Sequence, residues 1–172
     1  KIAQCCIAAK IANQRGTLLR FLRNHGDAAG ASDVQGVVNR LVDLQRRVDS
    51  VPTRDSLRAL EGEAASYYFG VFGHLILVND ASFSFTTRSR RPPMDRANAL
   101  LSFAYSLLAL DVRSALEAVG LDPYVGFLHV DRPGRPSLAL DLADSNLRPV
   151  RHAGVIKRLV NRLIGIVVLC VL

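Results

Sequence analysis

The stretch "DRANALLSFAYSLLALDVRSALEAVG" (residues 95–120) decides the fold class. After Asp95, mostly apolar residues return at alternating intervals of three and four, which is the spacing of one face of an α-helix. Gly120 follows the last of them and fits a helix C-cap. The stretch therefore predicts one long helix. The residues expected on its inward face are Asn98, Leu101, Tyr105, Leu108, Val112, Ala115 and Val119.

Three segments upstream show the same helical period. The first opens the chain and places Lys10 and three arginines toward solvent. The second begins at Ser32, which has a glutamine three residues later and so predicts a capping box. The third follows Thr53, a residue suited to an N-cap, and continues through residue 75. Four helices joined by short loops predict an all-α fold, a multi-helix bundle.

The segment "ASFSFTTRSRRPP" (residues 81–93) lies between the third and fourth helices. Its apolar and polar residues alternate, which fits either a short edge strand or an extended loop. Lys plus Arg outnumber Asp plus Glu by 22 to 15, and arginines dominate the cations. Because a guanidinium pairs with phosphate through two hydrogen bonds, this excess favours a nucleic-acid partner. Arg88, Arg90 and Arg91 are the candidate phosphate contacts.

Length and composition predict one domain spanning residues 1–172. The three cysteines have neither the even count nor the spacing of a disulfide framework or a zinc site, so a reducing compartment is expected. No signal peptide is visible in the first 25 residues, and the chain reads as cut from something longer. The apolar run at residues 165–172 is too short to span a bilayer, and no membrane partner is predicted.

A carboxylate falls among the inward residues of the third helix. Glu61 lies four after Leu57 and three before Ala64, so it shares their face, whereas Glu63 points roughly the opposite way. A carboxylate on an inward face is costly to desolvate unless a cation, a metal ion or a polar network meets it. One interpretation is an internal ion pair with an arginine, and the other is a ligand to a metal ion.

Further polar residues fall where core is expected. Asn98 lies on the inward face of the fourth helix, where it either caps the helix or supports a site. His129 follows the apolar "YVGFL" and is either a core histidine or a ligand. Asp141 and Asp144 share one face if Ser137 opens a helix, and point to opposite faces if "SLALDLA" is a strand. Together with a glutamate, such oxygen and nitrogen ligands suit Mg²⁺ or Mn²⁺ better than zinc.

Several stretches of the amino-acid sequence identify the protein's relatives more specifically than the spacing of its polar residues does. The stretch from "RRPPMDRANALLSFAY" through "GFLHVDRPGRPSLALDLAD" (residues 90–144) closely resembles the α-helical catalytic domain of the CRISPR-associated adaptation integrases, the endonucleases that insert new spacers. "KIANQRGTLLRFLRNH" and "LRALEGEAASYYF" resemble the preceding helices of the same family. The likeness covers residues 7–149 and is most similar to members that accompany type I-C systems.

The resemblance implies a set of site residues. Glu61 matches the glutamate of the family's "EG", His129 the histidine of "GFLH", and Asp144 the acidic ligand three after a first aspartate. These three would be the catalytic residues that hold Mg²⁺ or Mn²⁺. Asp141 is then the supporting acid, and Asn98 a structural or supporting residue. The implied reaction is metal-dependent transesterification, in which a 3′ hydroxyl of prespacer DNA joins the CRISPR repeat.

The resemblance also implies partners and shows departures. The implied partners are DNA, a small companion adaptation protein and, in the full-length family, a second copy of the chain. Relatives begin with an N-terminal β domain that is missing from this sequence, and residues 150–172 read as a divergent or truncated tail. The alternatives are a catalytically inactive fragment that only binds DNA through its arginines, and a helical interaction module whose acidic residues form structural ion pairs.

Overall fold

The structure is a computed structural model that describes residues 1–78, 80, 83–129 and 132–145, with the side chains of Asp144 and Ser145 outside the description. Its helices are α1 (Ile2–Asn24), α2 (Ala31–Arg47), α3 (Arg54–Gly70), α4 (Arg96–Ala118) and α5 (Ser137–Ser145), with short 3₁₀ turns at Val48–Ser50 and Phe72–Leu75. The described residues contain no strand. The predicted all-α bundle is confirmed, whereas the predicted tail at residues 150–172 lies outside the described residues.

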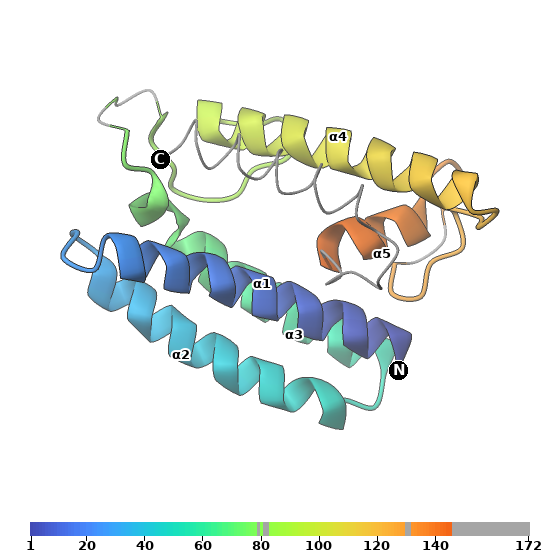
Figure 1. Cartoon of the computed structure of the whole chain (residues 1–172), viewed down its shortest axis with the longest axis horizontal. Coiled ribbons are helices and arrows are strands. Elements are labelled where there is room, and N and C mark those ends of the chain that lie inside the picture. The colour runs from blue at the N-terminus through green and yellow to red at the C-terminus, as the bar shows by residue number, and fades with distance from the viewer. Residues whose placement is uncertain (79, 81–82, 130–131, 146–172) are drawn as a thin grey trace.

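The helices form two packed groups that meet at α5. Helices α1, α2 and α3 lie side by side, and α5 lies between α1 and α4 (Figure 1). The larger apolar cluster joins α1, α2 and α3, and it also takes in Leu128 from the loop before α5. A smaller cluster joins α4 to α5. The short helix α5 therefore connects the long helix α4 to the three-helix core.

The predicted helix starts at Thr53 and Asp95 are confirmed. Thr53 Oγ1 accepts a hydrogen bond from Ser56 N at 3.1 Å, and Asp95 Oδ1 accepts one from Asn98 N at 2.6 Å. The capping box at Ser32 is wrong, because α2 begins one residue earlier and its N-cap is Gly30, which makes no side-chain cap. Gly30 has a φ of 90°, a left-handed conformation that side chains rarely adopt, so backbone geometry sets this start.

We expect Gly30→Ala to lower the free energy of unfolding by about 2 kcal/mol. A Cβ at this position would lie 2.3 Å from His74 Nδ1, so steric overlap adds to the strain of the positive φ. Urea unfolding followed by circular dichroism measures the change. Gly36→Ala is the matched control: this helical glycine has open space around it, so alanine should leave stability unchanged or raise it by up to about 1 kcal/mol. A Gly30→Ala protein as stable as the parent would contradict the assignment.

The predicted inward face of α4 is correct at its first turn and drifts toward its end. Asn98, Leu108 and Val112 are buried, but Tyr105 is exposed and Val119 is 70% exposed, with Leu116 taking the inward position near the end. Residues spaced alternately by three and four repeat every 3.5 residues on average, whereas a straight helix has 3.6 residues per turn. The predicted positions therefore rotate away from the buried face by about 20° per heptad. Similarly, α3 ends at Gly70 rather than residue 75, and the last residues form a 3₁₀ turn.

Helix α4 is also the one described helix that is long and apolar enough, by length and composition, to cross a membrane. Core helices pass the same test, so this is weak evidence for a membrane span.

Of the stretch before α4, the described residues 83–93 form a loop rather than the edge strand that was the other prediction.

Candidate active site

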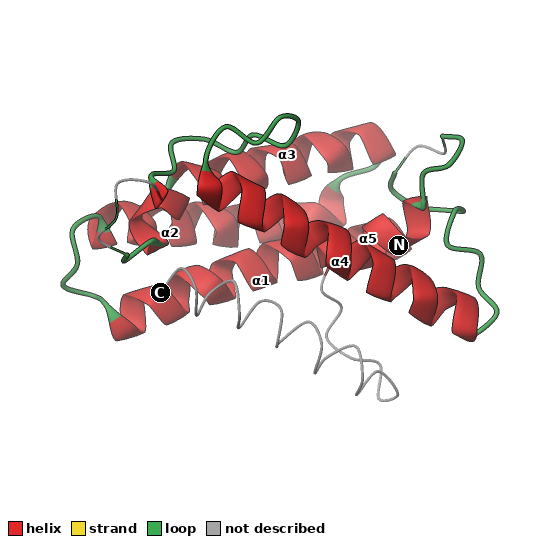
Figure 2. Cartoon of the chain, turned by 90° about the horizontal axis from the view of Figure 1, so that it is seen from above, coloured by secondary structure: helices red, strands yellow, loops and turns green. Residues whose placement is uncertain are grey.

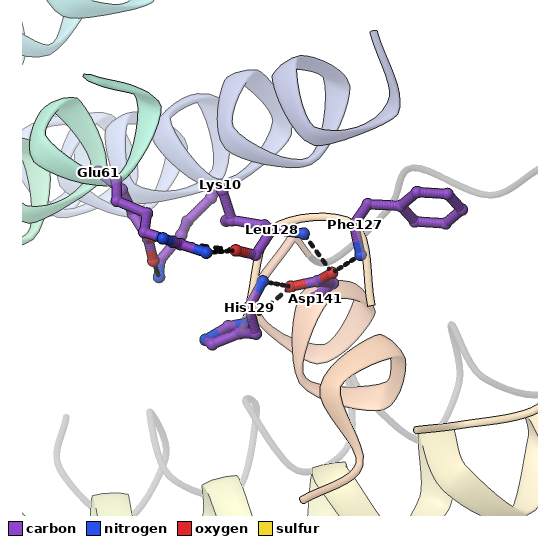
Figure 3. A network of polar contacts seen from close by, with 7 residues as sticks. Lys10, Glu61, Phe127, Leu128, His129 and Asp141 are labelled. Carbon is purple, nitrogen blue, oxygen red and sulfur yellow. Dashed lines mark hydrogen bonds and ion pairs between the residues drawn. The ribbon is translucent and has the colours of Figure 1, made fainter. Parts of the chain in front are cut away.

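The loop that carries His129 is held by one carboxylate from α5. Asp141 is 2% exposed, and its Oδ2 accepts hydrogen bonds from Phe127 N at 2.7 Å and Leu128 N at 2.9 Å. Its Oδ1 accepts a third from His129 N at 3.1 Å. Gly126 lets the loop come this close, since a Cβ there would lie 2.7 Å from the Ser137 Cβ. The "GFLH" sequence is thus a turn built around the Asp141 carboxylate (Figure 3).

The same carboxylate orients the imidazole of His129. Asp141 Oδ1 lies 2.5 Å from His129 Nδ1, and because the carboxylate is an acceptor, this contact favours the tautomer in which Nδ1 donates and Nε2 is the ring nitrogen available to a ligand. Burial by itself would raise the pKa of Asp141, but the hydrogen bonds from His129 and the three backbone N–H groups hold it below its ordinary value. Asp141 therefore stays ionised and fixes the tautomer of His129, as carboxylates do beside metal-ligating histidines.

An arginine ties this loop to the helix that carries Glu61. Arg58 Nε and Nη2 donate to the Leu128 carbonyl oxygen at 3.0 and 2.6 Å. Arg58 lies three residues before Glu61 on α3, and residues at this spacing are neighbours on one helix surface. The contact fixes the residue before His129 against the same surface of α3.

Glu61 forms an ion pair with Lys10 of α1. The two side chains are 18% and 15% exposed, which confirms that Glu61 points toward the bundle interior and contradicts the expectation that Lys10 faces solvent. The partner is a lysine and not the arginine considered from the sequence. Glu63, by contrast, lies 3.6 Å from Arg47 with 39% of its side chain exposed. The Lys10–Glu61 pair lies close to His129 and Asp141 (Figure 3).

The predicted metal ligands are partly visible in the described residues. Glu61 and His129 come from different segments to one region of the bundle (Figure 3), and α5 forms as the helix that puts Asp141 and Asp144 on one face. The side chain of Asp144 lies outside the description. Among the side chains that are described, no three of His, Cys, Asp and Glu form a metal-binding group. The described donors nevertheless are of types that bind divalent ions, because one is a carboxylate and the other an imidazole oriented by a second carboxylate.

Asn98 supports the loop before α4. It is fully buried, donates from Nδ2 to the Thr87 carbonyl oxygen at 2.8 Å, and accepts at Oδ1 from Ser89 N at 3.0 Å. Its side chain also bonds Asp95 and Arg88. All these partners belong to residues 87–95, so the contacts agree with a structural role for Asn98.

The three predicted phosphate-binding arginines differ in burial and in the hydrogen bonds that they already make. Arg88 is half-buried, and its Nη1 donates to Asn98 Oδ1 at 2.8 Å while Nη2 donates to Ser102 Oγ at 3.2 Å. Arg90 and Arg91 are exposed. Arg88 therefore links the loop to α4 with two of its nitrogens, whereas the side chains of Arg90 and Arg91 are exposed to solvent.

Sequence reasoning missed Lys10 and Arg58 as parts of the site. Arg58 could have been found, since it lies one helical turn from Glu61 on the same face. The sequence offers little indication of Lys10. It differs from the other basic residues before residue 150 only in that it is one of two lysines among arginines. Its pairing with a residue 51 positions away depends on how α1 crosses α3, which a linear pattern does not report.

The fold and the site define a helical domain in which a carboxylate of one helix lies near a histidine–aspartate couple held by another. A family model described as "CRISPR associated protein Cas1" matches residues 1–164. The chain belongs to the Cas1 family, which confirms the resemblance seen in its sequence.

Individual relatives agree with this family. The chain is 55% identical over 165 residues to the CRISPR-associated endonuclease Cas1 2 of Rhodospirillum rubrum, with 94% of this chain and 48% of that protein covered. It is similar to a chain of a partial Cas6-RT-Cas1–Cas2 complex, with a TM-score of 0.74 and 31% identity over 95% of this chain and 45% of that one.

A third likeness is to a casposase bound to an integration product, with a TM-score of 0.68 and 25% identity over 96% of this chain and 42% of that one. The chain spans about half the length of the curated relatives it matches.

Proposed function

We propose that this chain carries the catalytic centre of a divalent-metal-dependent DNA endonuclease and integrase that acts in CRISPR spacer acquisition. The observation that carries the proposal is the His129–Asp141 couple, whose free Nε2 lies in the same region as Glu61 (Figure 3). Membership of the Cas1 family supports the same reaction class. Glu61, His129 and Asp144 would hold Mg²⁺ or Mn²⁺, and Asp141 would support His129.

When bound, a divalent ion would supply positive charge to the scissile phosphate and lower the pKa of the attacking hydroxyl. The chain's own residues prepare the site for it. Asp141 holds a proton on Nδ1 of His129 so that Nε2 is a donor atom, and Arg58 fixes the loop backbone. Lys10 compensates the charge of Glu61 by pairing with its Oε1 atom.

The proposed reaction exchanges one phosphodiester for another. The 3′ oxygen of the prespacer forms a bond to a phosphorus atom at the repeat boundary, and the bond from that phosphorus to the 3′ oxygen of the repeat strand breaks. The attacking hydroxyl loses a proton and the leaving 3′ oxygen gains one. Since one P–O bond forms for each that breaks, positioning and charge stabilisation are the main requirements on the protein.

The proposed partners are prespacer DNA, the CRISPR repeat, the small companion adaptation protein and a second copy of the chain, in a prokaryotic cytoplasm. Two similar structures support DNA and the companion protein as partners, because one is a partial Cas6-RT-Cas1–Cas2 complex and the other is a casposase bound to an integration product. The net charge of +7 favours contact with the phosphate backbone. Arg90 and Arg91 are proposed as backbone contacts, with Arg88 bound into the loop beside them.

Removal of the metal ion tests the reaction class. EDTA is expected to abolish strand transfer on a branched DNA substrate, and excess Mn²⁺ to restore it, because the site needs the charge of the ion. Binding of the same DNA, measured by fluorescence anisotropy in parallel, is the control and should survive EDTA. Strand transfer that persists in EDTA would contradict the proposal. Salt-sensitive binding without transfer under any condition would favour a fragment that only binds DNA.

A further inference from the structure

A pocket of about 370 Å³ lies between α3 and the loop before α4. Small residues and one aromatic ring of α3 form one wall, and hydroxyl and guanidinium groups of the loop form the other. The lining residues are Gly62, Ala65, Ser66, Phe69, Gly70, Thr86, Thr87, Arg88 and Arg90. Figure 2 shows loops beside α3 at the edge of the bundle. The pocket therefore offers hydrogen-bond donors and positive charge against a helix surface with little side-chain bulk.

The electrostatics of the pocket favour an anion. Burial lowers the pKa of Arg88 and the positive charge of Arg90 lowers it further. Tyr105 and Asp95 act on this pKa in the opposite direction, so two guanidinium groups lie at one wall and are only partly compensated. The Nε of Arg88 is buried and has no hydrogen-bond partner among the described residues. An unsatisfied buried donor and a pair of like charges both destabilise a protein, by roughly 1–3 kcal/mol for the donor alone. An anion bound in the pocket would offset the repulsion between the two guanidinium groups.

The α3 wall of the pocket contains a glycine, Gly62, that neither helix stability nor packing explains. Gly62 lies inside α3, where alanine would be more favourable by about 1 kcal/mol. A Cβ at Gly62 would have no atom within 4 Å, so packing against the described residues does not require glycine. Gly16 and Gly36 are equally open in their helices but do not line the pocket, so an open glycine alone is no evidence of a ligand. At Gly62 the open wall coincides with the guanidinium groups.

We propose that this pocket binds a phosphodiester of a DNA strand, with Gly62 allowing the strand to approach α3 and Arg90 pairing with the phosphate. The proposal rests on the proposed function, since it assigns the path of the same substrate. Hydroxyls of Ser66, Thr86 and Thr87 suit backbone contacts that carry no sequence information. Ala65 lies one helical turn from Glu61, at about 6 Å between Cβ atoms. A strand held here would therefore run past the proposed metal ligands.

The test is DNA binding in EDTA, which keeps it independent of the metal site. Binding of a labelled single-stranded oligonucleotide to the full chain is measured by anisotropy over a series of salt concentrations. Gly62→Ala is expected to weaken binding about tenfold, the low end for one methyl group placed in a binding pocket, while the melting temperature stays unchanged or rises. Gly36→Ala should have the same effect on melting and none on binding. Arg90→Gln should weaken binding and reduce the salt slope by about 1.

Each outcome decides the matter. Unchanged binding by Gly62→Ala, or equal weakening by Gly36→Ala, overturns the pocket while leaving the proposed function standing. A parent chain that binds no single strand overturns the pocket and the proposed DNA substrate together. If Gly62→Ala weakens binding of inorganic phosphate but leaves binding of the strand unchanged, the pocket is a site for a free phosphate ion and the assignment to DNA is overturned.

Discussion

His129→Ala is expected to reduce Mn²⁺-dependent strand transfer at least about a hundredfold, because replacing only the outer partner of a ligand already lowers activity by roughly 10- to 100-fold. The imidazole is the only nitrogen donor of the proposed site, and Asp141 fixes its orientation from behind. DNA affinity should change little, since basic side chains and not the site residues carry it. Transfer is measured on a branched DNA substrate, with affinity measured on the same substrate.

Matched variants separate loss of a ligand from general damage. Glu61→Ala and Asp144→Ala should fail as His129→Ala does. Glu63→Ala and His74→Ala should transfer normally, because Glu63 lies by Arg47 and His74 lies near Asp33 on the surface. Wild-type turnover by any of the three ligand variants would remove that residue from the site. Loss in the parent chain as well, with binding intact, would mean that the fold is present without its chemistry.

Asp141→Ala is expected to lower the free energy of unfolding by about 3 kcal/mol, because the change leaves several buried donors without an acceptor. The carboxylate accepts from three consecutive backbone N–H groups and from the imidazole, and it is 2% exposed. Urea unfolding measures the loss. Asp122→Ala is the control, since Asp122 is an exposed loop carboxylate that accepts one bond from Tyr124 N at 2.9 Å. This variant should lose less than about 1 kcal/mol.

The same substitution has a second expected consequence. Without Asp141 the imidazole of His129 loses the partner that fixes its tautomer, so strand transfer should fall by roughly 10- to 100-fold even where the protein is folded. Asp141→Asn keeps the size of the side chain and one acceptor oxygen, and should recover part of the stability. Asp141→Ala with the stability of the parent would contradict the account of how the loop is held.

Local patterns predicted the helices because each pattern is set within one helix. Thr53 caps α3 as expected, and Asp95, where the fourth helix was expected to open, is the N-cap of α4, since an N-cap bonds its own first turn. Glu61 was separated from Glu63 by helical geometry alone, and the exposed fractions of 18% and 39% agree. The start of α2 was missed because a left-handed glycine beside His74 sets it, and that contact joins residues 44 positions apart.

The candidate site was less predictable because it depends on contacts between segments. The periodicity of "SLALDLA" left helix and strand open, and α5 forms as a helix against α1 and α4. The role of Asp141 as acceptor for three successive N–H groups has no periodic signature, since the loop from Gly126 to His129 is not regular structure. The choice of Asp144 as the third ligand came from the family resemblance and stays a prediction.

The most direct measurement is the anomalous X-ray signal of Mn²⁺ in crystals of the protein grown with that ion. The account predicts one strong peak within coordination distance of a Glu61 carboxylate oxygen, His129 Nε2 and an Asp144 carboxylate oxygen, and no such peak in crystals of His129→Ala. A peak at another place, or an empty region between Glu61 and His129 at saturating Mn²⁺, would contradict the claim that these residues hold the catalytic ion.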